Sequence, residues 1–179
     1  GLPQVQKVLR WAVEQIDRRA WWATSYQDLI SCALGELKDA KALYDAGFER
    51  PPHDRYEGIA KALAATGDAE YLYLAGRDWP DIRFSERITQ ALVHTGDAHY
   101  LYLAGKNWRE ERFSEAIADA LAECNDPIYL YLAGRDWPSY RFSEAIAKAL
   151  ARIGSARKLY LAGRDWREWH FVIPEIAQA

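Results

Sequence analysis

The sequence predicts an all-α protein, an α-solenoid of about five 29-residue helix-turn-helix repeats. The segment YLAGRDW occurs at residues 73–79, 131–137 and 160–166, and the variant YLAGKNW occurs at 102–108. Two residue types recur every 29 positions, tryptophan at Trp79, Trp108, Trp137 and Trp166, and glycine at Gly47, Gly76, Gly105, Gly134 and Gly163. Between them, apolar residues follow helical spacing, at Phe113, Ile117, Ala120 and Leu121.

The repeats are expected to form one domain that begins near the N-terminus. Trp21 lies two periods before Trp79, so the periodic region starts at about residue 20. We expect an N-terminal capping helix and first turn at residues 1–24 and the helical-repeat array at residues 25–179.

The first helix of each repeat is short, as in the segment AHYLYLA at 98–104. Gly96 is expected to stop the preceding helix, and Asp97 to cap the new one by accepting from a free N–H of its first turn. The same position is held by Asp39, Asp68, Asp126 and Ser155. We expect this helix to end at Gly105, with that glycine at positive φ.

The second helix is longer and amphipathic, as in the segment ERFSEAIADALAE at 111–123. Arg83, Arg112 and Arg141 each stand three residues before Glu86, Glu115 and Glu144. This spacing places each pair on one helix face and favours ion pairs that join repeats. One helix pair cannot cover both of its apolar faces, so the pairs are expected to stack on one another.

The two-helix array resembles HEAT-like and tetratricopeptide-like α-solenoid proteins in the broad sense, and the segment LAGRDWPSYRFSEAIAKAL at 132–150 resembles the helix and turn of leucine-rich-variant and HEAT-like repeats. The segment DAEYLYLAG at 68–76 resembles a helix of uncharacterised bacterial and phage repeats. With a period of 29, the chain is most similar to uncharacterised helical repeats of bacteria and phages. The resemblance covers roughly residues 20–170 and implies a right-handed two-helix solenoid that serves as a binding scaffold.

Composition makes nucleic acid a less favoured partner and argues against a membrane. The net charge is -3, so no overall basic excess points to nucleic acid or a membrane surface. The apolar runs are too short to span a bilayer, and the first residues lack the layout of a signal peptide. Two cysteines, Cys32 and Cys124, form no CxxC pair, which favours a reducing cytoplasmic setting.

No catalytic motif, metal site or cofactor motif is present, and we expect a protein that is not an enzyme. The chain has no Walker loop, GxGxxG or GxSxG. The four histidines have no metal-ligand spacing: His53, His94, His99 and His170. Cys124 aligns with the apolar Ile153, so a buried thiol is favoured over a nucleophile.

A protein or peptide partner is the favoured ligand, and the residues that differ between repeats are the candidate contacts. On the first helices these residues are Glu70, His99, Ile128 and Arg157. On the second helices they are Gln90, His94, Asp119, Glu123, Lys148 and Arg152. Packing does not require one residue type at these positions, so either a ligand or neutral drift explains the differences.

The alternative function is a HEAT-like nucleic-acid-binding module, with glycosylase-type chemistry as some HEAT-like proteins have. The turns would supply cations to phosphates and indoles to bases, through Arg77, Trp79, Lys106, Trp108, Arg135, Trp137, Arg164 and Trp166. We favour a structural role for these residues, in which the indoles pack between repeats and each Asp pairs with a neighbouring Arg.

The C-terminal repeat replaces the polar Ser-Glu of the other copies with Val172 and Ile173, after Phe171. Three explanations stay open: these residues fold back over the last core, the natural chain continues, or this end pairs with another chain. We expect an adhesive end that forms a homodimer or docks a partner through Phe171, Val172 and Ile173.

Overall fold

The computed structural model describes residues 39–48, 57–79, 85–108, 114–138 and 144–166. Every element in these ranges is an α-helix, which confirms the all-α class for the described part of the chain. The chain divides into two compact units, Gly1–Ala91 and Leu92–Ala179, and the boundary falls within α6 (Ser85–Thr95). The expected capping helix at residues 1–24 lies outside the described residues, so the predicted domain division stays a prediction.

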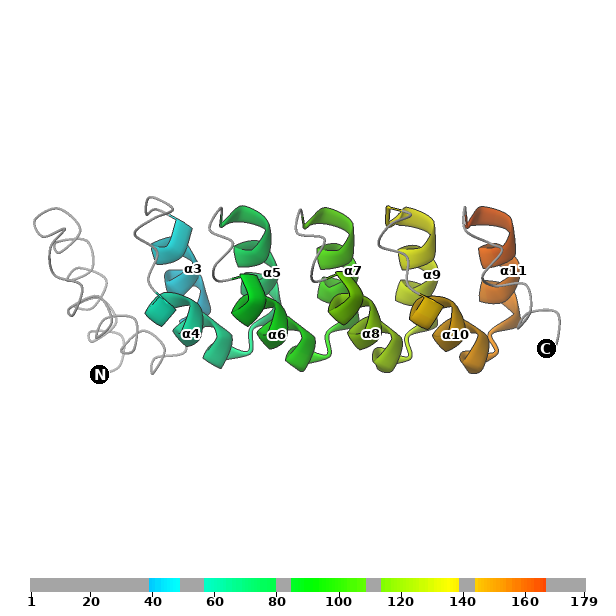
Figure 1. Cartoon of the computed structure of the whole chain (residues 1–179), viewed down its shortest axis with the longest axis horizontal. Helices are drawn as coiled ribbons and strands as arrows, with labels where there is room; N and C mark the ends of the chain where they lie inside the picture. Colours follow the sequence, from blue (N-terminus) through cyan, green and yellow to red (C-terminus); the bar gives the residue numbers. More distant parts are fainter. Residues whose placement is uncertain (1–38, 49–56, 80–84, 109–113, 139–143, 167–179) are drawn as a thin grey trace, which may run out of the picture. The chain divides into compact units, whose positions relative to one another are not determined.

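In unit 1, α3 (Ala40–Phe48) packs against α4 (Glu57–Thr66) and α5 (Ala69–Asp78) (Figure 1). One leucine from each helix is completely buried between them: Leu43, Leu63 and Leu72. These residues belong to the core of the described part of unit 1.

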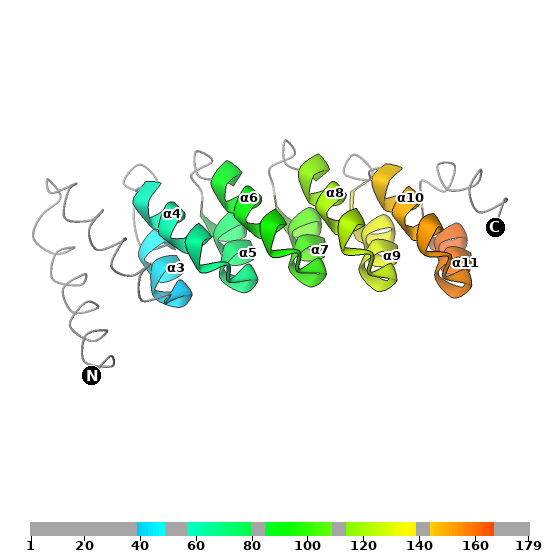
Figure 2. The ribbon, with the colours of Figure 1, turned by 90° about the horizontal axis from the view of Figure 1, so that it is seen from below.

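In unit 2, short first helices alternate along the chain with second helices. The first helices are α7 (Ala98–Asn107), α9 (Pro127–Asp136) and α11 (Ala156–Asp165), and the second helices are α8 (Ser114–Cys124) and α10 (Glu144–Ile153). Each first helix contacts the next first helix, and α8 contacts α10 (Figures 1 and 2). The core lies between the two rows, where Leu101, Leu121, Leu130 and Leu150 are completely buried.

The helix starts follow the expected caps. Asp97 Oδ1 accepts from the backbone N–H groups of His99 and Tyr100 at 3.0 and 3.2 Å, and Asp126 accepts in the same way from Ile128 and Tyr129. Asp39 accepts in the same way from the N–H of Ala42, and Asp68 accepts from the N–H of Tyr71. The side chain of Ser155 makes no capping hydrogen bond at the start of α11.

The prediction of positive φ was wrong for the glycines of the first helices. The prediction that a glycine stops the second helices was right. Gly105 does not end its helix at positive φ: α7 continues to Asn107, and Trp108 caps it. The glycines at positive φ are those that end second helices, Gly67, Gly96 and Gly154, with Asn125 at φ 54 in the same position. The position before the capping Asp or Ser therefore needs glycine or asparagine, because these residues adopt the left-handed region at little steric cost.

Gly105 has a different role, because it lies under the indole of Trp137. A Cβ built on Gly105 would overlap Trp137, and one built on Gly134 would overlap Trp166. The same arrangement joins Gly47 and Trp79 in unit 1. Glycine recurs at these positions because it lets an indole approach the helix backbone closely.

Candidate functional site

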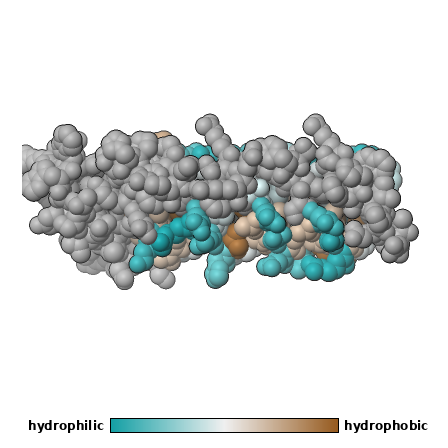
Figure 3. Space-filling view, in the orientation of Figure 1, coloured by the Kyte–Doolittle hydropathy of each residue, from teal (hydrophilic) through white to brown (hydrophobic). Residues whose placement is uncertain are grey.

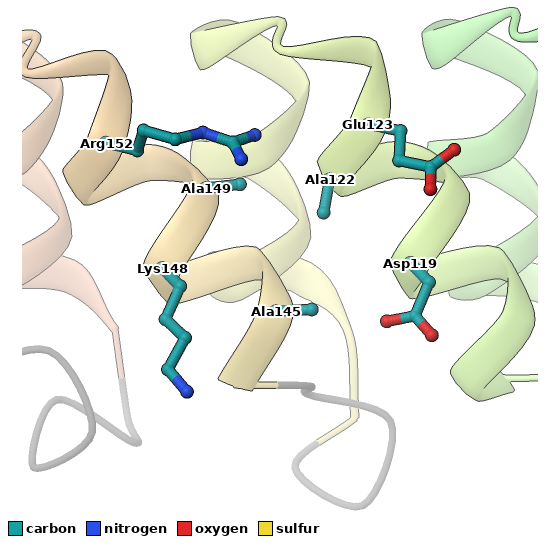
Figure 4. A pocket seen from close by; sticks show the side chains of 7 residues that line it. All are labelled: Asp119, Ala122, Glu123, Ala145, Lys148, Ala149 and Arg152. Atoms are coloured by element: carbon teal, nitrogen blue, oxygen red, sulfur yellow. The ribbon is translucent and has the colours of Figure 1, made fainter.

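The candidate site is an open groove of about 370 Å³ on unit 2, between α8 and α10 (Figure 4). Four residues that differ between repeats line it, and three alanines complete the lining: Asp119, Ala122, Glu123, Ala145, Lys148, Ala149 and Arg152. The small alanine side chains leave space between the two helices. The groove therefore brings together four of the ten predicted partner-binding residues.

The two sides of the groove carry opposite charge. Asp119 and Glu123 are four residues apart on α8, and Lys148 and Arg152 are four residues apart on α10, so each pair lies along one helix face. All four side chains are exposed. In Figure 4 the side chain of Ala122 on α8 and those of Ala145 and Ala149 on α10 face one another across the groove. This separation of charge is a property of the fold, because it needs α8 and α10 to be neighbours.

The cations of the groove already have partners, whereas its carboxylates have none among the residues that the structure describes. Arg152 donates to Asn125 Oδ1 at 2.7 Å, and Lys148 forms an ion pair with Glu144 at 2.8 Å. The carboxylates of Asp119 and Glu123 form no hydrogen bond or ion pair with another described residue. The acidic side is therefore free to bind a cationic group.

The other six predicted partner-binding residues do not line this groove. Ile128 is 50% exposed on α9, and His99 makes edge contacts with the rings of Tyr100 and Tyr129. Gln90 donates to Glu86 at 3.3 Å. Glu70, His94 and Arg157 are exposed. On the described part of unit 2, Figure 3 shows hydrophilic clusters separated by apolar surface.

The alternative nucleic-acid ridge has a different geometry from the one its function needs. Its four indoles are buried, with 3–9% exposure at Trp79, Trp108, Trp137 and Trp166. The Nε1–H of Trp137 donates to the Tyr102 carbonyl at 3.0 Å, and that of Trp166 donates to the Tyr131 carbonyl at 2.9 Å. In this arrangement the indoles are not available to stack on bases, and the expected packing role is supported.

The cations of the ridge are paired with the adjacent carboxylates. Arg77, Arg135 and Arg164 each donate two hydrogen bonds to the following residue, Asp78, Asp136 or Asp165. Lys106 reaches across to Asp136 at 3.3 Å. These contacts neutralise much of the positive charge that a phosphate would need. The ion pairs expected on the second helices are not described, because their arginines lie outside the described residues: Arg83, Arg112 and Arg141.

A tyrosine–aspartate contact, which the sequence-based prediction did not include, accompanies the three turns that contain aspartate. Tyr44 donates to Asp78 at 2.7 Å, Tyr102 to Asp136 at 2.5 Å, and Tyr131 to Asp165 at 2.5 Å. The two residues are 34 positions apart in each case. The signal was present as a tyrosine three residues before each repeated glycine, but a spacing longer than one period concealed it.

These contacts lower the pKa of the aspartates and raise the pKa of the tyrosines. The guanidinium of Arg164 and the hydroxyl of Tyr131 lower the pKa of Asp165 to about 2. Arg135, Tyr102 and Lys106 lower the pKa of Asp136 in the same way, although burial opposes them. Burial and the hydrogen bond to Asp78 raise the pKa of Tyr44 to about 12. The tyrosines therefore act as neutral donors to ionised carboxylates.

Other chemistry finds little support in the described part of the chain. Those residues contain no group of three or more His, Cys, Asp or Glu side chains that could hold a metal ion. Cys124 is half-buried, donates to the Gly96 and Ala120 carbonyls, and has a pKa raised by burial. None of the described helices has the length and apolar character that crossing a bilayer requires.

Comparison with known proteins gives no family for this chain. No protein-family model matches it, and neither a curated protein nor a solved structure shows significant similarity to it.

Proposed function

We propose that the chain is a non-catalytic helical-repeat scaffold, a solenoid of 29-residue repeats that binds a protein or peptide. The repeat inference rests on the Trp–Gly and Tyr–Asp contacts, which recur at the same register in both units. Repeated contacts of this kind are typical of solenoids, in which each repeat contacts its neighbours. The resemblance to HEAT-like proteins remains a guide to architecture only.

The binding proposal rests on one observation: an open groove between α8 and α10 has an acidic side whose carboxylates have no partner among the described residues. A peptide with an apolar side chain over the alanines and a Lys or Arg beside α8 would be complementary to it. An acidic group on the other side would meet Lys148 and Arg152. Opposite charges on the two sides favour such a peptide over a uniformly charged polymer.

A displayed peptide library tests this proposal directly. Peptides are selected on the full chain and on an Ala145→Trp variant, in which a large side chain fills the groove but every charged residue is kept. An exposed residue of α8 outside the groove provides the matched control, Glu115→Trp. We expect enriched peptides to carry basic and apolar residues, to bind the control and to lose binding to Ala145→Trp.

The charge pattern is tested by the double variant Asp119→Lys, Glu123→Lys. It makes both sides of the groove basic, so the selected peptides should bind it at least about tenfold more weakly. Peptides that bind all the variants equally would exclude the groove as their site.

The nucleic-acid alternative is tested by filter binding to single- and double-stranded DNA and RNA at low and moderate salt. Binding that falls steeply with salt would favour it, because phosphate contacts release counterions. The buried indoles and paired arginines argue against this function.

A further inference from the structure

In unit 2, α7 and α9 each have a receiving face, formed by a tyrosine and a glycine three residues later, on which the next first helix packs. On α9 this face consists of Tyr131 and Gly134. The indole of Trp166 packs over Gly134, and its Nε1–H donates to the Tyr131 carbonyl. The Tyr131 hydroxyl donates to the Asp165 carboxylate. The face of α7 receives Trp137 and Asp136 in the same three ways.

Helix α11 carries the same receiving face, and none of the described residues covers it. Tyr160 and Gly163 have the spacing of Tyr131 and Gly134. The ring of Tyr160 is 71% exposed, whereas Tyr102 and Tyr131 are 8% and 6% exposed. A Cβ on Gly163 would meet nothing within 4 Å, whereas one on Gly105 or Gly134 would overlap an indole. A surface with the composition of two buried contacts is therefore exposed on α11.

The contacts on α7 and α9 indicate which kind of partner would be complementary to the face of α11. On both α7 and α9, the occupant is the C-terminal end of a helix that finishes in Asp-Trp. The indole needs the bare glycine backbone, and the carboxylate needs the tyrosine hydroxyl. On α7, Lys106 also contacts the incoming Asp136 at 3.3 Å, and Arg164 occupies the equivalent position on α11.

We propose that Tyr160 and Gly163 of α11 form a docking site for a helix that ends in Asp-Trp and belongs to another polypeptide. The incoming indole covers Gly163 and donates to the Tyr160 carbonyl, and the incoming carboxylate accepts from the Tyr160 hydroxyl. This surface shares no residue with the groove between α8 and α10, so it is a separate site.

The probe is a synthetic peptide with the sequence of residues 126–153, which contains α9, α10 and an uncovered Asp136-Trp137. A lactam between Glu144 and Lys148, an i,i+4 ion pair at 2.8 Å, holds its second helix, and circular dichroism verifies its helicity before use. Binding to the full chain is followed by fluorescence anisotropy. The control peptide carries Trp137→Ala. Because a buried Trp anchor usually dominates its interface, the control should bind at least about tenfold more weakly.

The matched receptor variant is Gly163→Val in the full chain. Its side chain has open space, so the melting temperature should stay close to that of the parent, while the peptide affinity falls at least about tenfold. Tyr160→Phe should weaken binding by a smaller factor, since it removes only the hydroxyl donor.

Three results would overturn the proposal. Equal affinities for the parent and Trp137→Ala peptides would show that the indole does not dock. The same conclusion follows if the helical peptide fails to bind at millimolar concentration. A large fall in the melting temperature of Gly163→Val would show that another part of the chain covers α11.

Discussion

The indole of Trp137 lies directly on Gly105 of the preceding first helix, and its Nε1–H donates to the carbonyl of Tyr102 at 3.0 Å. The ring is 6% exposed, so its polar atom has exchanged water for a backbone acceptor. Asp136, the residue before it, accepts from the Tyr102 hydroxyl. Two adjacent residues therefore hold α9 on α7 through one apolar contact and two hydrogen bonds.

Substitution of the two kinds of glycine separates their roles. Gly105→Ala places a methyl group inside the volume of the Trp137 ring, and we expect a loss of about 1–3 kcal/mol, the usual cost of overpacking. Gly96→Ala meets no neighbouring atom but is held at φ 64, so it should cost about 1 kcal/mol. Chemical denaturation measures both.

The control for this pair is Gly96→Asn, because Asn125 occupies the equivalent position at φ 54. Asparagine tolerates the left-handed region, so this variant should be milder than Gly96→Ala. If Gly105→Ala proved as stable as the parent, the close packing of Trp137 on Gly105 would be refuted.

Deleting the Trp137 side chain should be the most damaging single change within unit 2. Trp137→Ala is expected to cost about 3–5 kcal/mol, since it removes a buried aromatic ring and leaves a cavity beside Gly105. Trp137→Phe keeps part of the ring but removes the donor to Tyr102, so its loss should be smaller. Urea denaturation followed by circular dichroism gives both values, and two equally mild variants would contradict this packing.

The sequence predicted the helices well because their signals are local. Asp97 and Asp126 cap the helices that they precede, and the second-helix residues Ile117 and Leu121 are buried as their spacing indicated. The role of Gly105 was mistaken because glycine suits both a left-handed turn and a close helix contact. Only the position of Trp137, 32 residues away in the sequence, distinguishes these two uses.

The groove between α8 and α10 was also only partly predictable from the sequence. Variation between repeats indicated Asp119, Glu123, Lys148 and Arg152, but it indicated six other residues equally. Which of them share a surface depends on the neighbours of each helix, and α8 and α10 are separated in the chain by α9. The hydrogen bond from Arg152 to Asn125 was also not predictable, because it joins α10 to the residue that follows α8.

The capping residues provide a further paired prediction. Asp97→Ala removes an acceptor for two free N–H groups of α7 and should cost about 1 kcal/mol. Ser155 holds the same position before α11, but its side chain makes no capping hydrogen bond, so Ser155→Ala should change stability much less. Thermal denaturation at neutral pH compares the two. An equal loss in both variants would show that the hydrogen bonds of Asp97 are not the cause.

Alkaline pH should weaken the Tyr–Asp contacts and so lower the stability of the fold, because the pKa values of the tyrosines are raised in the folded state. Burial and the hydrogen bond to Asp78 raise the pKa of Tyr44 from 10.0 to about 12. Burial and Asp136 raise the pKa of Tyr102, and Asp165 and burial raise that of Tyr131. A group with a raised pKa in the folded state binds its proton more tightly there than in the unfolded chain. Its contribution is complete below pH 10 and is lost as the pH rises toward 12.

We therefore expect the free energy of unfolding to fall between pH 10 and about 12, with tyrosinate absorbance rising over the same range. Tyr44→Phe cannot ionise, so this variant should be less stable than the parent at neutral pH and should lose less stability as the pH rises. Tyr160→Phe is the matched control, because Tyr160 is 71% exposed and its hydroxyl contacts no described carboxylate. If Tyr44→Phe and Tyr160→Phe show the same alkaline loss as the parent, the Tyr44–Asp78 hydrogen bond is not what links stability to alkaline pH.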